Sequence, residues 1–489
     1  MTVLLTGGDL TRDEVVRVAR GHEPVALHDR ARAQMATTRD VVRRAVAAGS
    51  AVYGTTTGVG VLKRIGLNAD DADAYSSWML AHHLVGQGPL APPDVVKATI
   101  LRLANHLAEG SPGVRPELAD RLIVALNDGE AATVHATGSV GSADLAPLAE
   151  IAQALVVERG FALEPGEGTA LLDNNAFSTG WATLAVADTA ALLDAMDVAG
   201  AVSLEGFAAN PSMLDPAVGR VRPYPGLQRT LARLGRLLDG SAIHDPDVPR
   251  NLQDPLSFRN LPQIHGAVRD VLDHVDGVLA IELNANQGNP IVVPEADRIV
   301  SVANFEILPL AAALDYLRLV LATALTSATE RVVKSLYPVW SGLPTGLVPE
   351  GDTTHAGLTY LSLAAQSLAV EARLLAAPVS FELVSTAHAE GIEDRTTTAP
   401  LAARRLAEMV GIGTTIAAIE LAVGAQAIEV RGLRRGAGSG RAVAAVRRHV
   451  PFLGMDQHVP DVAALVAAIR DGSFLAAAEP GETGDVDRP

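Results

Sequence analysis

The sequence predicts a mainly α-helical protein with a long central helical bundle and a smaller mixed N-terminal domain. Of its 489 residues, 48% are hydrophobic but only 3% are aromatic. A core built mostly from alanine, leucine and valine favours long, closely packed helices. From about Gly266 onward, apolar residues recur at helical spacing in long runs with few breakers. Helices of this length usually lie side by side as a bundle.

We expect an N-terminal domain over residues 1–200, a helical bundle over 201–478 and a disordered tail over 479–489. The N-terminal domain is expected to begin with a short strand, followed by a helix that opens after Thr11. Glycine-rich loops then interrupt the helical pattern. The predicted segments are a strand over 2–5, a helix over 29–48, loops at 86–89, 110–113 and 138–141, and bundle helices over 266–285, 311–336, 356–376 and 400–431.

Charge and composition exclude several classes of partner. A formal net charge of -17 repels polyanions, which argues against nucleic acid. The chain has no cysteine, so disulfides and thiolate chemistry are excluded. The first ten residues lack the pattern of a signal peptide, and the most apolar stretch, 307–328, carries Asp315 and Arg318 and is predicted to be a buried helix. We therefore predict a cytoplasmic protein with no membrane partner.

The stretch "HATGSVGSADLAPLAE" at 135–150 combines a glycine-rich turn with the start of a helix. Its local pattern predicts that Asp144 is the N-cap of that helix. Several other loops carry glycine, amide and aromatic residues in similarly dense groups. They are "VYGTTTGVG" at 52–60, "LQDPLSFRNLPQ" at 252–263, "NANQGNP" at 284–290, "ANFE" at 303–306, "SGLPTGLVP" at 341–349 and "EDRTTTAPLAAR" at 393–404.

These motifs, taken in order, resemble the aromatic amino acid lyase family, which includes histidine, phenylalanine and tyrosine ammonia-lyases and related aminomutases. The match runs nearly end to end. It implies an ammonia-lyase fold of the fumarase/aspartase type and a homotetramer in which several subunits line each active site. Small side chains on the predicted helices agree with close packing between chains.

The family's prosthetic group is methylidene-imidazolone (MIO), an electrophile made when an internal Ala-Ser-Gly cyclises and loses water. Here the corresponding loop is one residue shorter and reads Gly138-Ser-Val-Gly-Ser-Ala-Asp144. If the gap follows Ser142 or Ala143, no serine is central and MIO cannot form. If it follows Val140, the triad is Gly141-Ser142-Ala143, with alanine where glycine best tolerates the compressed backbone. We therefore expect no cofactor, with MIO from this triad as the disfavoured alternative.

The resemblance also assigns roles to single residues, each with an ordinary structural alternative. Tyr53 matches the base that removes the β-proton, and a phenol serves this role only if its pKa is lowered from about 10. Arg259 matches the arginine that binds the substrate carboxylate through its planar guanidinium. Glu393 matches a glutamate near the substrate amine; a solvated ion pair with Arg395 is its alternative. The remaining matches are Gln253 and Asn289 as pocket amides, Phe305, and His83 beside the substrate ring.

Departures from the family pattern cluster on the groups that would hold MIO and substrate. Many members have tyrosine where this chain has Leu256, and asparagine where it has Asp173. Phe305 is kept, but the histidine that follows it in the family is Glu306. Neither His82 nor His83 has a partner at metal-ligand spacing, so no metal site is predicted.

The sequence and this resemblance therefore predict a lyase-type enzyme that acts without MIO, by elimination or addition across the Cα–Cβ bond of a small amino acid or related carboxylate. Elimination from an ordinary amino acid needs the electrophile, whereas a substrate with an acidic proton or a better leaving group does not. Asp173 would bind a cationic group or act as a second acid or base, beside Tyr53 and Glu393. The alternatives are an MIO-dependent ammonia-lyase or aminomutase, and a non-catalytic homologue in which Arg259 only holds a carboxylate ligand.

Overall fold

The computed structural model describes residues 2–348, 355–381, 388–454 and 458–479. It divides into two compact units that interleave along the sequence. Unit 1 contains residues 1–187, 275–315 and 378–404, and unit 2 contains 188–274, 316–377 and 405–489. The predicted division into 1–200 and 201–478 therefore differs from the structure, because segments late in the sequence pack with the N-terminal residues.

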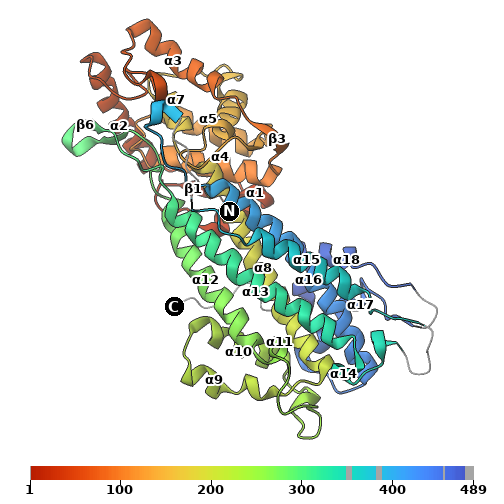
Figure 1. Cartoon of the computed structure of the whole chain (residues 1–489). Coiled ribbons are helices and arrows are strands. Elements are labelled where there is room, and N and C mark those ends of the chain that lie inside the picture. The colour runs from red at the N-terminus through yellow and green to blue at the C-terminus, as the bar shows by residue number, and fades with distance from the viewer. Residues whose placement is uncertain (1, 349–354, 382–387, 455–457, 480–489) are drawn as a thin grey trace. The chain divides into compact units, whose positions relative to one another are not determined.

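Unit 1 is mixed, as predicted, with short strands among its helices (Figure 1). The predicted N-terminal strand is β1, which pairs in parallel with β2. Thr11 caps the first helix in a capping box with Glu14, as its position before the helix suggested. Helix α4 is buried almost throughout and packs against α1 and α5. The strands are β1 (Val3–Leu5), β2 (Val25–Leu27), β3 (Gln87–Leu90), β4 (His135–Thr137), β5 (Ile291–Val293) and β6 (Arg298–Val300).

The remaining sheets of unit 1 are antiparallel pairs, β3 with β4 and β5 with β6. The β5–β6 hairpin packs on α2, which Figure 1 shows beside it. The helices of unit 1 are α1 (Arg12–Gly21), α2 (Asp29–Ala47), α3 (Ala69–His82), α4 (Pro93–Ala108), α5 (Pro116–Asn127), α6 (Leu145–Ala152) and α7 (Glu167–Leu172).

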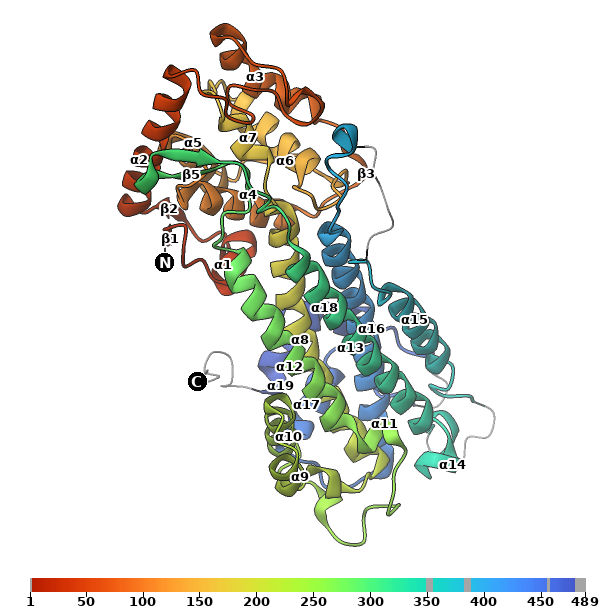
Figure 2. The same ribbon diagram turned by 60° about the vertical axis from the view of Figure 1, so that its left-hand side comes forward.

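The described residues of unit 2 form helices and loops without a strand, and this unit holds the greater part of the long helices, which run side by side in Figures 1 and 2. The predicted bundle helices all occur, with ends shifted by several residues. The helices are α8 (Ala176–Phe207), α9 (Pro216–Val221), α10 (Pro225–Leu237), α11 (Leu256–Arg259), α12 (Leu261–Glu282), α13 (Leu308–Ser335), α14 (Pro338–Ser341), α15 (Leu361–Leu375), α16 (Ala399–Arg431), α17 (Ala437–Arg447), α18 (Ala463–Arg470) and α19 (Ser473–Ala478).

Small residues set the spacing between α8 and α16 in unit 2. A Cβ atom added at Gly206 would lie 2.9 Å from the Cβ of Ala427, and one added at Gly424 would lie 2.8 Å from Cγ1 of Val202. Larger side chains would force the two helices apart. The prediction that an alanine-rich composition serves close helix packing is thus borne out at these contacts.

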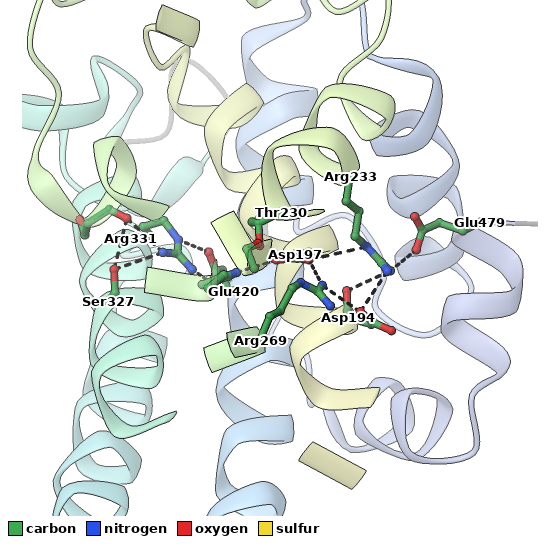
Figure 3. Close-up of polar contacts among 12 residues, drawn as sticks. Asp194, Asp197, Thr230, Arg233, Arg269, Ser327, Arg331, Glu420 and Glu479 are labelled. Atoms are coloured by element: carbon green, nitrogen blue, oxygen red, sulfur yellow. Dashed lines mark hydrogen bonds and ion pairs between the residues drawn. The ribbon is translucent and has the colours of Figure 1, made fainter. Parts of the chain in front are cut away.

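Buried ion pairs tie the bundle helices together within unit 2 (Figure 3). Asp197 on α8 is fully buried, accepts a hydrogen bond from Nδ1 of His265 at 2.7 Å and pairs with Arg269, both on α12. The positive charge of Arg269 and the His265 hydrogen bond outweigh burial and lower the Asp197 pKa to about 2. Arg331 on α13 similarly pairs with Glu420 on α16, with Nε and Oε1 2.5 Å apart.

Within the described part of the chain, two helices, α13 and α16, are long and apolar enough to cross a membrane by length and composition alone. In their most apolar windows 61% and 72% of the residues are buried inside the protein, as in core helices. The predicted tail lies outside the described residues except for Glu479, whose carboxylate pairs with Arg233 in unit 2.

Candidate active site

A cavity of ≈ 370 Å³ in unit 1 gathers most of the residues that the sequence motifs singled out. A volume of this size suits a small-molecule ligand. The predicted residues that line it are Tyr53, His83, Ser142, Asp173, Asn289, Phe305 and Glu393. Segments separated by more than three hundred positions in the sequence thus meet around one space.

Tyr53 is held in place by a tight glycine turn. Gly54 follows it with φ +65°, and a Cβ there would lie 2.2 Å from the Thr169 hydroxyl oxygen, so only glycine fits. The Tyr53 hydroxyl accepts a hydrogen bond from the backbone N–H of Gly60 at 3.0 Å. Burial raises the Tyr53 pKa to about 12, and repulsion by Asp173 and Glu393 adds to the rise. The Gly60 hydrogen bond acts in the opposite direction but does not offset it.

Asp173 is the most strongly perturbed carboxyl group in this cavity. It directly follows α7, and burial raises its pKa to about 8, with the negative charge of Glu393 contributing in the same direction. A hydrogen bond from the Asn289 side chain opposes this rise. Asp173 is therefore largely protonated near neutral pH until a cation enters the cavity. A carboxyl group with this pKa, beside a second carboxylate, can exchange a proton or pair with a cationic ligand.

The glycine-rich loop at 138–144 forms one wall of the cavity through Ser142. The Ser142 hydroxyl donates to the carbonyl of Arg395 at 2.6 Å. Thr397 donates from Oγ1 to the Gly141 carbonyl at 2.9 Å, so the loop is tied to the segment that carries Glu393. Gly141 has φ 84° and Ala143 φ 63°, both in the left-handed region. Alanine occupies this region at a cost that glycine does not pay.

The predicted helix cap at Asp144 is wrong in its partner. Asp144 stands at the N-cap position of α6, but its side chain makes no capping bond to that helix. Its carboxylate instead accepts hydrogen bonds from the hydroxyl of Ser139 at 2.6 Å and from the backbone N–H of Ser178 at 2.7 Å. Asp144 is fully buried, and its carboxylate joins the loop to the first turn of α8 instead of capping the start of α6.

His83 and Phe305 both line the cavity, and His82 is not among the described residues that line it. Nδ1 of His83 lies 2.7 Å from the Met79 carbonyl, which can only accept, so this nitrogen is the donor. The carbonyl of Phe305 accepts a hydrogen bond from the side-chain amide of Asn175 at 2.7 Å. These contacts fix both residues in the cavity wall.

Lys63 lines the cavity and was missed by the sequence motifs. Its ammonium group donates to Oε2 of Glu390 at 2.9 Å and to the carbonyl of Ala389 at 3.3 Å. The sequence feature that could have identified Lys63 is its position ten residues after Tyr53, at the end of an otherwise uncharged loop. Met79, Thr169 and Ser301 were also missed, because nothing in their local sequence marks them.

Arg259 and Gln253 lie in unit 2, and the residues that line the cavity all belong to unit 1. Arg259 ends α11, is exposed, and donates from its guanidinium to the side-chain oxygen of Gln253. Leu256 of the same motif is 60% exposed. The roles assigned to Arg259 and Gln253 stay predictions. Within the residues that the structure describes, no group of three or more His, Cys, Asp or Glu side chains is placed to hold a metal.

A helical protein with a tyrosine and two carboxyl groups around a cavity, beside a tied glycine-rich loop, has the features of a lyase that moves protons at a carbon centre. The aromatic amino acid lyase model matches residues 10–448, and the chain belongs to this family. The histidine ammonia-lyase of Symbiobacterium thermophilum is 34% identical over 503 residues, which cover 98% of this chain and 99% of that protein.

Solved structures agree with the predicted fold class. The ergothioneine-degrading enzyme ergothionase of Treponema denticola matches with a TM-score of 0.91 and 26% identity, covering 97% of this chain and 100% of that chain. Tyrosine aminomutase of Streptomyces globisporus matches with a TM-score of 0.90 and 27% identity, covering 98% of both chains. The predicted family, mainly helical fold and enzyme class, a carbon–nitrogen lyase, are confirmed.

Proposed function

We propose that this protein eliminates an already cationic amine from a small α-substituted carboxylate, across the Cα–Cβ bond and without MIO. The observation that carries the proposal is the grouping of Asp173, Glu393 and Tyr53 around one cavity, where burial and the negative charge of Glu393 raise the pKa of both Asp173 and Tyr53. Such a site is completed by a ligand with a fixed positive charge. That charge would lower both pKa values and bring Tyr53 closer to the range of a useful base.

The residues at the glycine-rich loop fit MIO poorly. Cyclisation requires the amide nitrogen of the third residue to reach the carbonyl carbon of the first, and that third residue is Ala143, which already has φ 63°. The Ser142 hydroxyl, which would be lost as water, is used in a hydrogen bond to the Arg395 carbonyl. These contacts support a loop that acts as a wall of the cavity. The proposed reaction therefore includes no electrophilic group.

Without an electrophile, the leaving group must itself be activated. A primary ammonium gives up an N–H proton to any base strong enough to take a Cβ proton, whereas a quaternary ammonium has no such proton. In the proposed reaction the Tyr53 phenolate takes the Cβ proton, the C–H electron pair becomes the Cα=Cβ bond, and the Cα–N pair leaves with a neutral tertiary amine. Asp173 and Glu393 would hold the cationic nitrogen. Ergothioneine, which a structural neighbour degrades, is a betaine of this kind.

The test is to compare matched substrates. We expect the purified protein to release trimethylamine from ergothioneine or from the trimethyl betaine of histidine, with appearance of the ultraviolet absorbance of the conjugated acrylate product. Histidine itself, with the same ring and carboxylate but a primary amine, should give no measurable product. Turnover of histidine but of neither betaine would contradict the proposal.

The second candidate is an MIO-dependent ammonia-lyase, which the likeness to histidine ammonia-lyases favours. Mass spectrometry distinguishes it without a substrate. We expect a peptide that spans residues 134–150 to have its unmodified mass. Loss of two water molecules confined to that peptide, and absent from Ser142→Ala, would establish the cyclised triad and reject the MIO-free proposal.

We also propose that the active protein is a homotetramer in which Arg259 and Gln253 of another copy complete the cavity with a carboxylate-binding group. Support comes from their exposure in unit 2 and from the lack of an arginine among the described residues that line the cavity. Size-exclusion chromatography with light scattering should give about four times the chain mass of 50.7 kDa. A monomer mass would contradict this assembly.

A further inference from the structure

Behind Asp173 lies a second, much smaller cavity, of ≈ 20 Å³, within unit 1. Asp173, Asn289 and Thr169 line both this cavity and the larger one, so they form a wall between them. A space of this volume accommodates one water molecule, provided that polar groups surround it. The other polar residues that line it are Thr55, His106 and Asn286.

His106 is a buried residue beside this small cavity whose ring nitrogens lack hydrogen-bond partners of good geometry in the part of the chain that the structure describes. It lies on α4, is 1% exposed, and neither ring nitrogen has a hydrogen-bond partner of good geometry among the described residues, although the carbonyl of Ala285 is near. Burial, with Arg102 one turn away adding to the effect, lowers its pKa well below the usual value, so the ring is neutral. A neutral imidazole has one donor and one acceptor, and leaving both unsatisfied is costly.

We propose that the small cavity is a binding site for a single structural water that links His106 to Asp173 and positions the Asp173 carboxyl group from the side away from the substrate cavity. One ring nitrogen of His106 can hydrogen-bond to this water, and the nearby carbonyl of Ala285 is available to the other. The Asn286 amide and the Thr55 hydroxyl supply further partners for the water. Other titratable groups around Asp173 are Glu393 and Tyr53, and Arg102 stands beside His106. His106 is thus a positioning residue that acts through the water on Asp173.

A crystal structure at high resolution tests the site directly. We expect one ordered water within hydrogen-bond distance of the His106 ring and Asp173 in the full-length protein. In Gly288→Ala the new Cβ would stand 3.0 Å from the Asp173 carbonyl oxygen and 3.3 Å from Cε1 of His106, so the water should be displaced. Gly8→Ala, whose Cβ meets nothing within 4 Å, is the matched control and should retain it. No density for water in the unmodified protein would overturn the proposal.

Variants of His106 test the consequence for Asp173 without using turnover. In infrared difference spectra against Asp173→Asn, His106→Leu should shift the acid-to-carboxylate ratio of Asp173 toward the acid by about tenfold or more, because a hydrogen bond to the carboxylate is lost. His106→Asn, which keeps a donor and an acceptor, should shift it less. An unchanged ratio in His106→Leu, together with a gain in thermal stability, would show that His106 has no water partner.

This inference rests on the proposed function only in taking Asp173 to face the substrate. The water and the infrared band are measured in protein without substrate. Their failure would leave the substrate comparison intact, and failure of the substrate comparison would leave the water site intact.

Discussion

Replacing Tyr53 with phenylalanine is expected to lower kcat by about 10²–10⁴-fold, the contribution typical of a positioned general base. The substitution removes only the hydroxyl, which accepts a hydrogen bond from Gly60 and lines the cavity. The ring and the glycine turn after it are kept, so ligand affinity should change little. Steady-state kinetics with the best betaine substrate, together with calorimetric binding of a non-reactive analogue, separate the two effects.

Tyr75 offers a matched control. The Tyr75 hydroxyl accepts a hydrogen bond from the backbone N–H of Val59 at 2.9 Å, just as the Tyr53 hydroxyl accepts one from Gly60. Tyr75, however, is not among the described residues that line the cavity. Tyr75→Phe should therefore retain most of kcat. Equal losses in the two variants would mean that Tyr53 only supports the loop. Unchanged ligand binding with no turnover in either the unmodified protein or Tyr53→Phe would favour a non-catalytic ligand-binding protein.

Replacing Asp173 with asparagine is expected to stabilise the fold by a few kcal/mol at pH 8 while weakening the binding of cationic ligands. The pKa of Asp173 rises from 3.8 to about 8 in the folded protein. Above pH 4 the unfolded chain ionises at this position while the folded chain still holds the proton. Each pH unit in that range costs up to about 1.4 kcal/mol of folding stability. Asparagine has no charge to desolvate, so the variant escapes this loss.

The pH dependence gives this prediction its sign. The stability gain of Asp173→Asn should be near zero at pH 4, grow as the pH rises, and level off above about pH 8. Differential scanning calorimetry at several pH values measures it. A gain that is equal at all pH values would show that Asp173 titrates normally. If the gain grows with pH as expected, Asp173 combines a cost in folding stability with a role in ligand binding, as residues of functional sites often do.

Asp197 is the control of opposite sign. Its pKa is lowered to about 2 by Arg269 and His265, so it stabilises the fold above its unfolded pKa of 3.8 and loses this contribution as the pH falls toward 2. Asp197→Asn would leave the Arg269 charge without its fully buried partner, which typically costs about 3–5 kcal/mol. The aspartate-to-asparagine substitution should thus lower the folding stability at Asp197 and raise it at Asp173.

The sequence by itself determined the helical class, the family and most of the residues around the cavity. Helical periodicity is a local property, and the alanine-rich composition limits the core to closely packed helices such as α8 and α16. The loop motifs are also local, so Tyr53, Asn289 and Glu393 were recognisable one by one. The shortened loop at Ser142 was visible in the same way.

Only the tertiary structure decided how these residues act on one another. The pKa values of Tyr53 and Asp173 depend on burial and on Glu393, which no local pattern reports. Asp144 joins the loop to α8 instead of capping α6, because Ser178 lies within reach of its carboxylate in space. Each unit is built from segments that are far apart in the sequence, because a packed core is defined by contacts in space and not by the order of segments along the chain. The small cavity beside His106 also depends on tertiary structure, because it forms where α4 meets the segment at 286–290.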